Sequence, residues 1–178
     1  MNSSYFIDIF LFTILTYSLY TDLKYGKIYN FITIPSIAAG LVVNALVNTN
    51  GALAGIYNGS AAVLIAFTFF IIPYMMGALG GGDVKLMMAI GALKGYIFLA
   101  VSILSIGLVS FALSLFIFMM QMFKDYKFSG MMNIIAGFYH KNILVDGDEL
   151  KPILKKNLKF GISIFLGTII AYIYLLNK

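Results

Sequence analysis

The sequence predicts an all-α membrane protein, a polytopic bundle of about six transmembrane helices. Of its 178 residues, 61% are hydrophobic and only 11% are charged. A soluble domain carries roughly 25% charged residues, so few residues of this chain can face water. The apolar residues also gather in long runs, and a helix needs roughly 20 of them to cross a membrane. The length suits a single membrane-embedded domain, residues 1–178.

The apolar runs give the predicted helices. They cover residues 4–21, 31–47, 59–77, 84–93, 96–123 and 160–176. The stretch from residue 84 to 123 is about twice as long as one crossing requires, so the chain must turn inside it. Lys94-Gly95 is the polar break within this stretch and is therefore the predicted turn. The helix before it would rise only about 15 Å, so it is short, tilted, or begins within the bilayer.

The lysines predict the orientation of the bundle. All twelve basic residues are lysines, and ten lie after the first span, after the third span, or in residues 124–159. These three segments alternate onto one side, which the positive-inside rule assigns to the cytoplasm, with both termini outside. The same bias and an affinity for anionic lipid account for the basic pI, so no nucleic-acid partner is expected. The multi-pass protein is thus expected in the cell membrane.

The remaining composition narrows the chemistry. The chain has no cysteine and a single histidine, His140, which excludes thiol catalysis and disfavours a metal centre. Neither a metal nor a cofactor is expected. Residues 124–159 are predicted to form a cytoplasmic loop, with an amphipathic surface helix at 129–139 that serves either as a linker or in substrate docking. The acidic turn at 146–149 lacks most ligands of an EF-hand and is interpreted as solvated loop.

Two acids lie where a membrane disfavours charge. Asp22 ends the first apolar run, and Asp83 follows Gly80-Gly81-Gly82 at the mouth of another. Such residues are rare and usually functional. The orientation above places both at the cytoplasmic end of the bundle, where two facing carboxyl groups cannot both ionise cheaply. One would then activate a water for attack on a peptide carbonyl, and its protonated partner would donate to the developing oxyanion.

Less specific interpretations of these residues remain open. The two acids can be a helix-start and a helix-end residue in interfacial water. The three glycines can allow unusual backbone conformations and a close substrate approach, or form a plain turn between helices. Lys85 can support substrate binding or simply follow the positive-inside rule. Asp8 lies about 21 Å before Asp22 on the same predicted helix, so it is expected at the opposite interface and not in catalysis.

The residues around both acids resemble a known family. Gly80, Gly82 and Asp83 match the G-x-G-D motif of the type IV prepilin peptidases, and the block PYMMGALGGGDVKLMMAIGALKG is similar to theirs. Asp22 in DLKYGKIYNFITIP resembles their first-helix aspartate, and the segment 159–164 weakly resembles the start of their last helix. The family's I-P-N reads I-Y-N here, so the proline that would stiffen that turn is absent.

This resemblance implies an activity and catalytic residues. The family members are membrane aspartyl proteases, so Asp22 and Asp83 would be catalytic, with Gly80, Gly81, Gly82 and Lys85 in a supporting loop. The substrate would be a pilin-like precursor, cut between its short basic leader and its apolar helix. The chain resembles the compact Tad/Flp-type or archaeal enzymes, because it lacks the cysteine-rich insert and extra helices of the long members that also methylate the product.

Two other functions compete with this prediction. A proton-coupled transporter or channel subunit could use Asp22 and Asp83 as a relay. A non-enzymatic assembly subunit of a secretion or pilus complex would need neither acid. If the acids form a dyad, helix ends favour the shared proton on Asp22, since Asp83 precedes a helix and Asp22 ends one.

Overall fold

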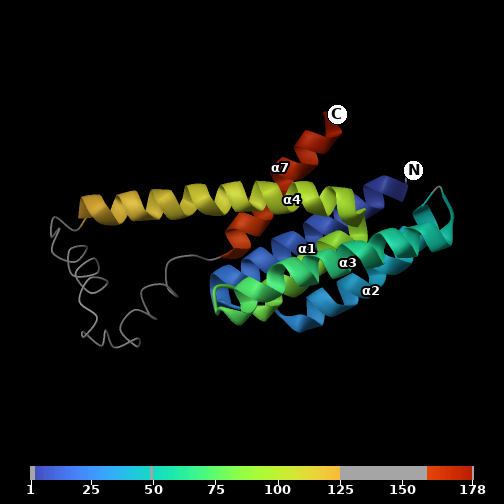
Figure 1. The fold of residues 1–178 in the computed structure, drawn as a ribbon, viewed down its shortest axis with the longest axis horizontal. Coiled ribbons are helices and arrows are strands. Elements are labelled where there is room, and N and C mark those ends of the chain that lie inside the picture. Colours follow the sequence, from blue (N-terminus) through green and yellow to red (C-terminus); the bar gives the residue numbers. More distant parts are fainter. Residues whose placement is uncertain (1–2, 49, 125–159, 178) are drawn as a thin grey trace. The chain divides into compact units, whose positions relative to one another are not determined.

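The structure, a computed structural model, describes residues 3–48, 50–124 and 160–177. Every regular element within these ranges is a helix (Figure 1). In chain order they are α1 (Ser3–Tyr25), α2 (Asn30–Val47), α3 (Ala52–Met75), α4 (Gly81–Lys124) and α7 (Phe160–Leu176). The helices α1 to α4 are long and apolar enough to cross a membrane, and α7 is a shorter apolar helix. The prediction of an all-α membrane protein is therefore confirmed.

The chain divides into two compact units. One comprises residues 1–109 and 160–178, and the other comprises residues 110–159. The first unit holds α1, α2, α3, the start of α4 and α7, and therefore both predicted catalytic acids. The predicted surface helix at 129–139 and the acidic turn at 146–149 lie outside the described residues.

The observed helices match the predicted spans with three extensions, of which the one at the end of α1 is described with the site below. The third helix begins at Ala52, not at residue 59, because residues 52–58 also pack as helix against α2. Gly55 makes this packing possible, since a Cβ there would lie 2.1 Å from the Asn44 carbonyl oxygen. The fourth begins at Gly81 rather than at residue 84, so Asp83 lies inside the first turn and not before it.

A break at Gly95 divides α4 into two segments, as predicted. Gly95 has φ +80° and ψ −179°, a backbone conformation that side chains disfavour. Figure 1 shows the chain reversing direction there. With the first segment (residues 81–94) counted separately from the second (from residue 96), the described residues contain six helical segments, as the sequence predicts.

Two asparagines replace the backbone hydrogen bond that this break removes. In an unbroken helix the Tyr96 N–H would donate to the Ala92 carbonyl, four residues earlier. Instead, the Tyr96 N–H donates to Asn58 Oδ1 at 3.2 Å, and Asn44 Nδ2 donates to the Ala92 carbonyl at 3.1 Å. Asn44 comes from α2 and Asn58 from α3. Each neighbouring helix therefore supplies a hydrogen-bond partner for one of the backbone groups freed at the break.

The first segment of α4 forms the centre of its unit. Its buried side chains include Leu86, Met87, Ile90 and Leu93, none more than 2% exposed. Small residues let its neighbours approach closely, as is common between membrane helices. A Cβ at Gly40 of α2 would lie 2.9 Å from the Ala92 backbone, and one at Gly91 would lie 3.1 Å from Ala62 of α3.

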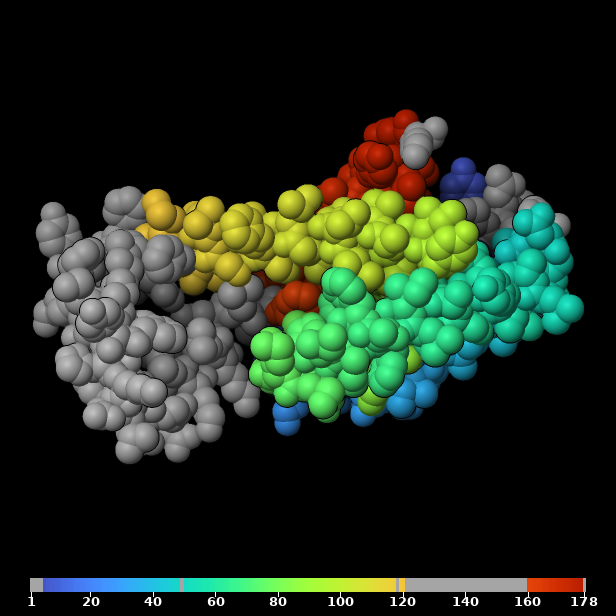
Figure 2. Space-filling model, viewed as in Figure 1, coloured from blue at the N-terminus to red at the C-terminus, as the bar shows by residue number. Residues whose placement is uncertain are grey.

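The outer faces of the helices carry large apolar side chains. In the space-filling view α3 lies on the outside of its unit (Figure 2), and its Leu64 and Ile72 are 65% and 63% exposed. Phe31 of α2 is 88% exposed. Contiguous apolar surface of this kind is typical of a protein whose solvent is lipid.

We expect the two asparagines at the break to contribute measurably to stability. Asn44→Leu and Asn58→Leu should each lower the free energy of unfolding by about 1–3 kcal/mol, because each leaves a backbone group without its partner. Thermal unfolding in detergent, followed by circular dichroism, measures the change. Asn50→Leu, in the exposed connection between α2 and α3, is the matched control and should have little effect. Wild-type stability in both break variants would contradict this account.

Candidate active site

Asp22 lies in the last turn of α1 and is 9% exposed. The helix extends to Tyr25, one turn beyond the predicted end, and closes at Gly26. The Gly26 N–H donates to the Asp22 carbonyl at 2.9 Å, and Gly26 has φ +64°. This left-handed glycine after the last helical residue is a common helix end. Asp22 is therefore fixed on a regular helix and not on a loose connection.

The carboxylate of Asp22 faces the first turn of α7. Its Oδ2 accepts the backbone N–H of Gly161 at 3.2 Å. Gly161 is the second residue of α7, where backbone N–H groups have no partner within the helix. A Cβ on residue 161 would lie 2.5 Å from Asp22 Oδ2. Only glycine therefore allows this approach. The close contact explains why a glycine stands in the segment 159–164, which only weakly resembles the start of the last helix of the prepilin peptidases.

Asp83 is the third residue of α4, and its side chain reaches back over the helix start. Its Oδ2 accepts the Gly80 N–H at 2.9 Å, while the Asp83 N–H donates to the Gly80 carbonyl at 3.1 Å. This is the acidic half of a capping box, which satisfies an otherwise unpartnered N–H group. Both acids thus contact a backbone N–H at the start of a helix. The sequence argument placed the shared proton on Asp22 because of the helix ends alone. Since both acids contact a helix start, that argument does not assign the proton.

The three glycines before Asp83 act through close contacts. The prediction that they adopt conformations closed to other residues is wrong, because none of them has a positive φ; in this connection only Gly77 does, at +74°. A Cβ on Gly82 would lie 2.6 Å from the Ile28 carbonyl oxygen, and one on Gly80 would lie 3.1 Å from Asp83 Oδ2. The start of α4 is thereby packed onto the connection that follows Asp22.

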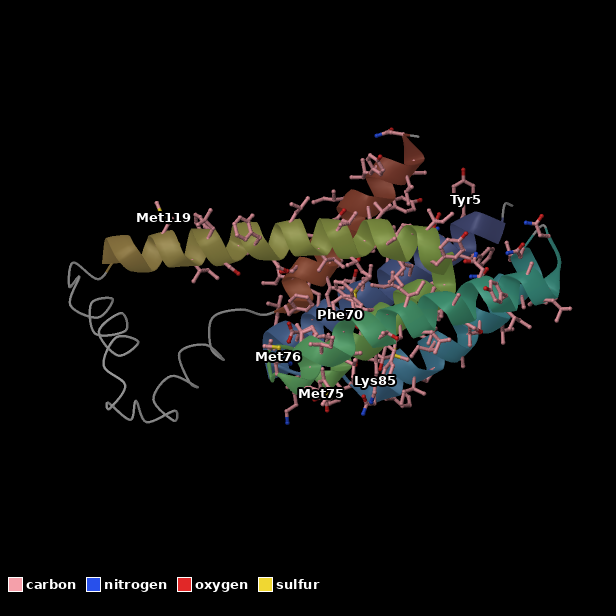
Figure 3. The ribbon with its side chains drawn as sticks, in the orientation of Figure 1. Tyr5, Phe70, Met75, Met76, Lys85 and Met119 are labelled. Carbon is pink, nitrogen blue, oxygen red and sulfur yellow. The ribbon has the colours of Figure 1, made fainter. Side chains whose placement is uncertain are left out.

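The side chain of Lys85 forms a hydrogen bond with another residue of the protein. Its amine donates to Asn30 Oδ1 at 2.8 Å, which links the first turn of α4 to the first residue of α2. The sequence shows Asn30 as the last residue of the I-Y-N segment but does not reveal this contact. Lys85 therefore supports the loop around the acids, and Figure 3 shows it at the end of the unit where Met75 and Met76 also lie.

The two acids share one end of their unit. The charge of Asp22 acts electrostatically on Asp83, and the contact between Gly82 and Ile28 joins the turns that carry them. Of the nearby amines, Lys85 donates to Asn30 Oδ1 and Lys24 donates to the Tyr20 hydroxyl at 3.0 Å. The arrangement suits a pair of carboxyl groups that share a proton.

An apolar groove with a volume of about 320 Å³ begins beside this site. Ile34 and Ile37 of α2 and Phe67 of α3 line it, together with the N-terminal part of α4. Gly81, two residues before Asp83, and Lys85 also belong to its lining. An extended apolar surface therefore leads to the backbone that carries one of the acids.

The fold and this site define a multi-pass helical membrane protein with two acids at one end of the bundle. The sequence matches the type IV leader peptidase family over residues 9–176. The match includes both acids and every described helix, and the chain belongs to this family. Membership identifies the chain as a peptidase, supports a leader-peptidase role and implies pilin-like precursors as substrates. No curated protein and no solved structure shows significant similarity to the chain.

We expect opposite effects on stability from alanine at two helical glycines. Gly161→Ala should lower the free energy of unfolding by about 1–3 kcal/mol, because its methyl group collides with Asp22. Gly107→Ala is the matched control, since nothing lies within 4 Å of a Cβ there; it should be neutral or stabilising by up to about 1 kcal/mol. Thermal unfolding in detergent compares the two. Equal effects would show that Asp22 does not approach α7 as described.

Proposed function

We propose that this protein is an aspartyl endopeptidase that removes the leader of pilin-like precursors. It hydrolyses the peptide bond between a short basic leader and the apolar helix that follows. The observation that carries the proposal is that Asp22 and Asp83, which come from different helices, lie at the same end of their unit and each accept a backbone N–H at the start of a helix. Family membership supports the same class of reaction.

The proposed mechanism uses the two carboxyl groups without a metal. The ionised group accepts a proton from a water molecule as that water attacks the peptide carbonyl carbon. The protonated group donates to the carbonyl oxygen, which gives a neutral tetrahedral intermediate. Collapse of this intermediate breaks the C–N bond, and the amine leaves with a proton from the dyad. The assignment of the two roles to Asp22 and Asp83 stays open, because the pair titrates jointly.

The apolar groove between α2, α3 and α4 is the proposed docking surface for the substrate's apolar helix. Its lining includes Gly81, so a helix lying in it ends close to the turn that carries Asp83. Gly81 has no side chain, and this leaves that end of the groove open. A Cβ at this position would lie 3.4 Å from the Tyr74 ring. A substrate bound in this way would present the residues before its helix to the two acids.

The proposed orientation places this site at the cytoplasmic face. Lys24, Lys27 and Lys85 lie at the end of the unit that carries Asp22 and Asp83, in agreement with the positive-inside rule. At the other end of the first α4 segment, Lys94 is neutralised by an ion pair with Asp8. The charge bias within the described residues therefore points in one direction, and the basic leader would approach from the cytoplasm.

The packing argues against a proton-coupled transporter. Asp8 and Lys94 place charge at the opposite end of α1 and of the first α4 segment. Between the two ends lie Leu11 and Leu15 of α1, each 1% exposed, and fully buried Met87 and Ile90 of α4. The buried polar side chains described in this layer are hydroxyls, such as those of Ser18, Ser163 and Thr168, and none is an acid or a base. The described core thus supports a site at one end over a relay across the bundle.

Cleavage of a pilin-like precursor by the purified protein tests the proposed function. Mass spectrometry of the product should find a new N-terminus at the start of the apolar helix, and EDTA should not inhibit the reaction. A product that begins beyond the apolar segment would refute the proposed cut, and inhibition by EDTA would indicate metal chemistry instead.

The two acids should both be required for this reaction. Asp22→Asn and Asp83→Asn should each reduce kcat by at least about 100-fold, because each removes one of the two proton-transfer groups. Activity is normalised to inserted protein in matched vesicles. Asp146→Asn, an acid outside the described residues that the sequence places in the polar segment, is the control and should retain activity. Near-normal turnover in either dyad variant would favour an assembly subunit or another catalytic centre.

Filling the groove should weaken binding of the substrate. Ile37→Trp should lower kcat/KM by about tenfold, mainly through KM, because the larger side chain occupies the space of the apolar helix. Val42→Trp is the control on the same helix, since Val42 is 59% exposed and does not line the groove. If both variants behave like the wild type, the groove holds lipid and the substrate docks elsewhere.

A further inference from the structure

A second polar cluster lies at the opposite end of the same helices. Asp8 of α1 forms an ion pair with Lys94 at the end of the first α4 segment. The Tyr172 hydroxyl of α7 donates to Asp8 Oδ2 at 2.9 Å, and the Lys94 amine lies 5.4 Å from the centre of the Tyr172 ring. The side chains of Lys94 and Asp8 are only 16% and 13% exposed. One carboxylate thus joins three helices.

These three helices are also the ones that build the site around Asp22. On α1, Asp22 follows Asp8 by 14 residues, or about 21 Å. On α4, Lys94 follows Asp83 by 11 residues, and on α7, Tyr172 follows Gly161 by 11 residues; both separations correspond to about 16 Å. The first α4 segment and α7 therefore both run antiparallel to α1. Each of the three helices contributes one residue or backbone group to the cluster at Asp8 and another to the site around Asp22.

The apolar surfaces between the two ends fix the axial position of the helices less strictly than a charged pair does. The contacts there are made by apolar and small residues such as Leu11, Leu15 and Ile164, and apolar burial is non-directional. A charged pair in a medium of low dielectric is strongly distance-dependent, and separating it leaves an uncompensated charge. A slide of α1 by one residue would displace Asp22 by about 1.5 Å and would separate Asp8 from Lys94.

We propose that Asp8 and Lys94, with Tyr172, are positioning residues that set the axial register of α1, α4 and α7. Through these helices they hold Asp22 and Asp83 at the separation that catalysis requires. The inference rests on the proposed function for its kinetic consequence, but the geometric consequence is independent of it. Neither Asp8 nor Lys94 contacts the substrate in this proposal.

Cross-linking measures the geometry without any substrate. The chain contains no cysteine, so Asp22→Cys on α1 and Gly161→Cys on α7 can be introduced into an otherwise thiol-free protein. A Cβ on residue 161 would lie 3.1 Å from the Asp22 Cβ, so a short bifunctional methanethiosulfonate should join α1 to α7 through the two cysteines. Adding Asp8→Asn or Lys94→Met should lower the cross-linking yield at this distant end. Thr13→Val, at an exposed position on α1 beside Asp8, is the matched control and should leave the yield unchanged.

Kinetics on the cysteine-free protein measures the consequence for the reaction. With a pilin-like precursor as substrate, Asp8→Asn and Lys94→Met should each lower kcat by about 10- to 100-fold, because displacement by about 1 Å misaligns catalytic groups. KM should stay within about twofold, which separates positioning from substrate binding. The exchanged pair Asp8→Lys/Lys94→Asp should recover most of the lost kcat. A general loss of stability would lower the amount of folded enzyme but not kcat per folded molecule.

The outcomes distinguish this proposal from the proposed function. Reduced cross-linking in the single variants, with recovery in the exchanged pair, supports the positioning role even if the wild type cleaves no precursor. Unchanged cross-linking and unchanged kcat in folded Asp8→Asn would overturn it. So would an exchanged pair whose cross-linking yield stays as low as that of the single variants.

Discussion

The reversal of α4 at Gly95 is the constraint on which the rest of the first unit depends. A chain that turns back within a bundle of apolar helices leaves backbone groups without partners, and each such group is costly wherever water cannot bind it. Here the two freed groups, the Ala92 carbonyl and the Tyr96 N–H, are bound by Asn44 and Asn58. The reversal therefore requires α2 and α3 on either side of it. It also ends the first α4 segment after 14 residues, with Asp83 near one end and Lys94 at the other.

Close approach of backbones is the second requirement, and glycine provides it. Gly40, Gly55 and Gly91 let α2, α3 and α4 pack together, while Gly82 and Gly161 bring the start of a helix against the surroundings of Asp22. The same residue type thus serves the packing of the bundle and the geometry of the site. In neither place is a special φ required, and the absence of a side chain is what matters.

The two ends of α1 have different chemical characters although both carry an aspartate. Asp8 is compensated by an amine and a hydroxyl, which suits the structural role proposed for it. Asp22 contacts a backbone N–H and experiences the charge of a second acid. Two carboxyl groups at the same end of a bundle can share a proton between them. This contrast supports the assignment of the chemistry to the end that carries Asp22 and Asp83.

The sequence by itself determined the class of protein, the six helical segments, the turn at Lys94-Gly95 and the two candidate acids. These follow from local properties: long apolar runs, a glycine in a polar break, and charge where a membrane disfavours it. Only the tertiary structure decided which groups meet, because the pairs Asp22–Gly161, Gly82–Ile28, Lys85–Asn30 and Asp8–Lys94 join residues far apart in the chain. Sequence spacing fixes neighbours within one helix, but it contains no direct information on the register between helices. That register depends on small residues and polar contacts at particular heights, which is why the support of Asp22 by α7 and the cluster at Asp8 emerge only in three dimensions.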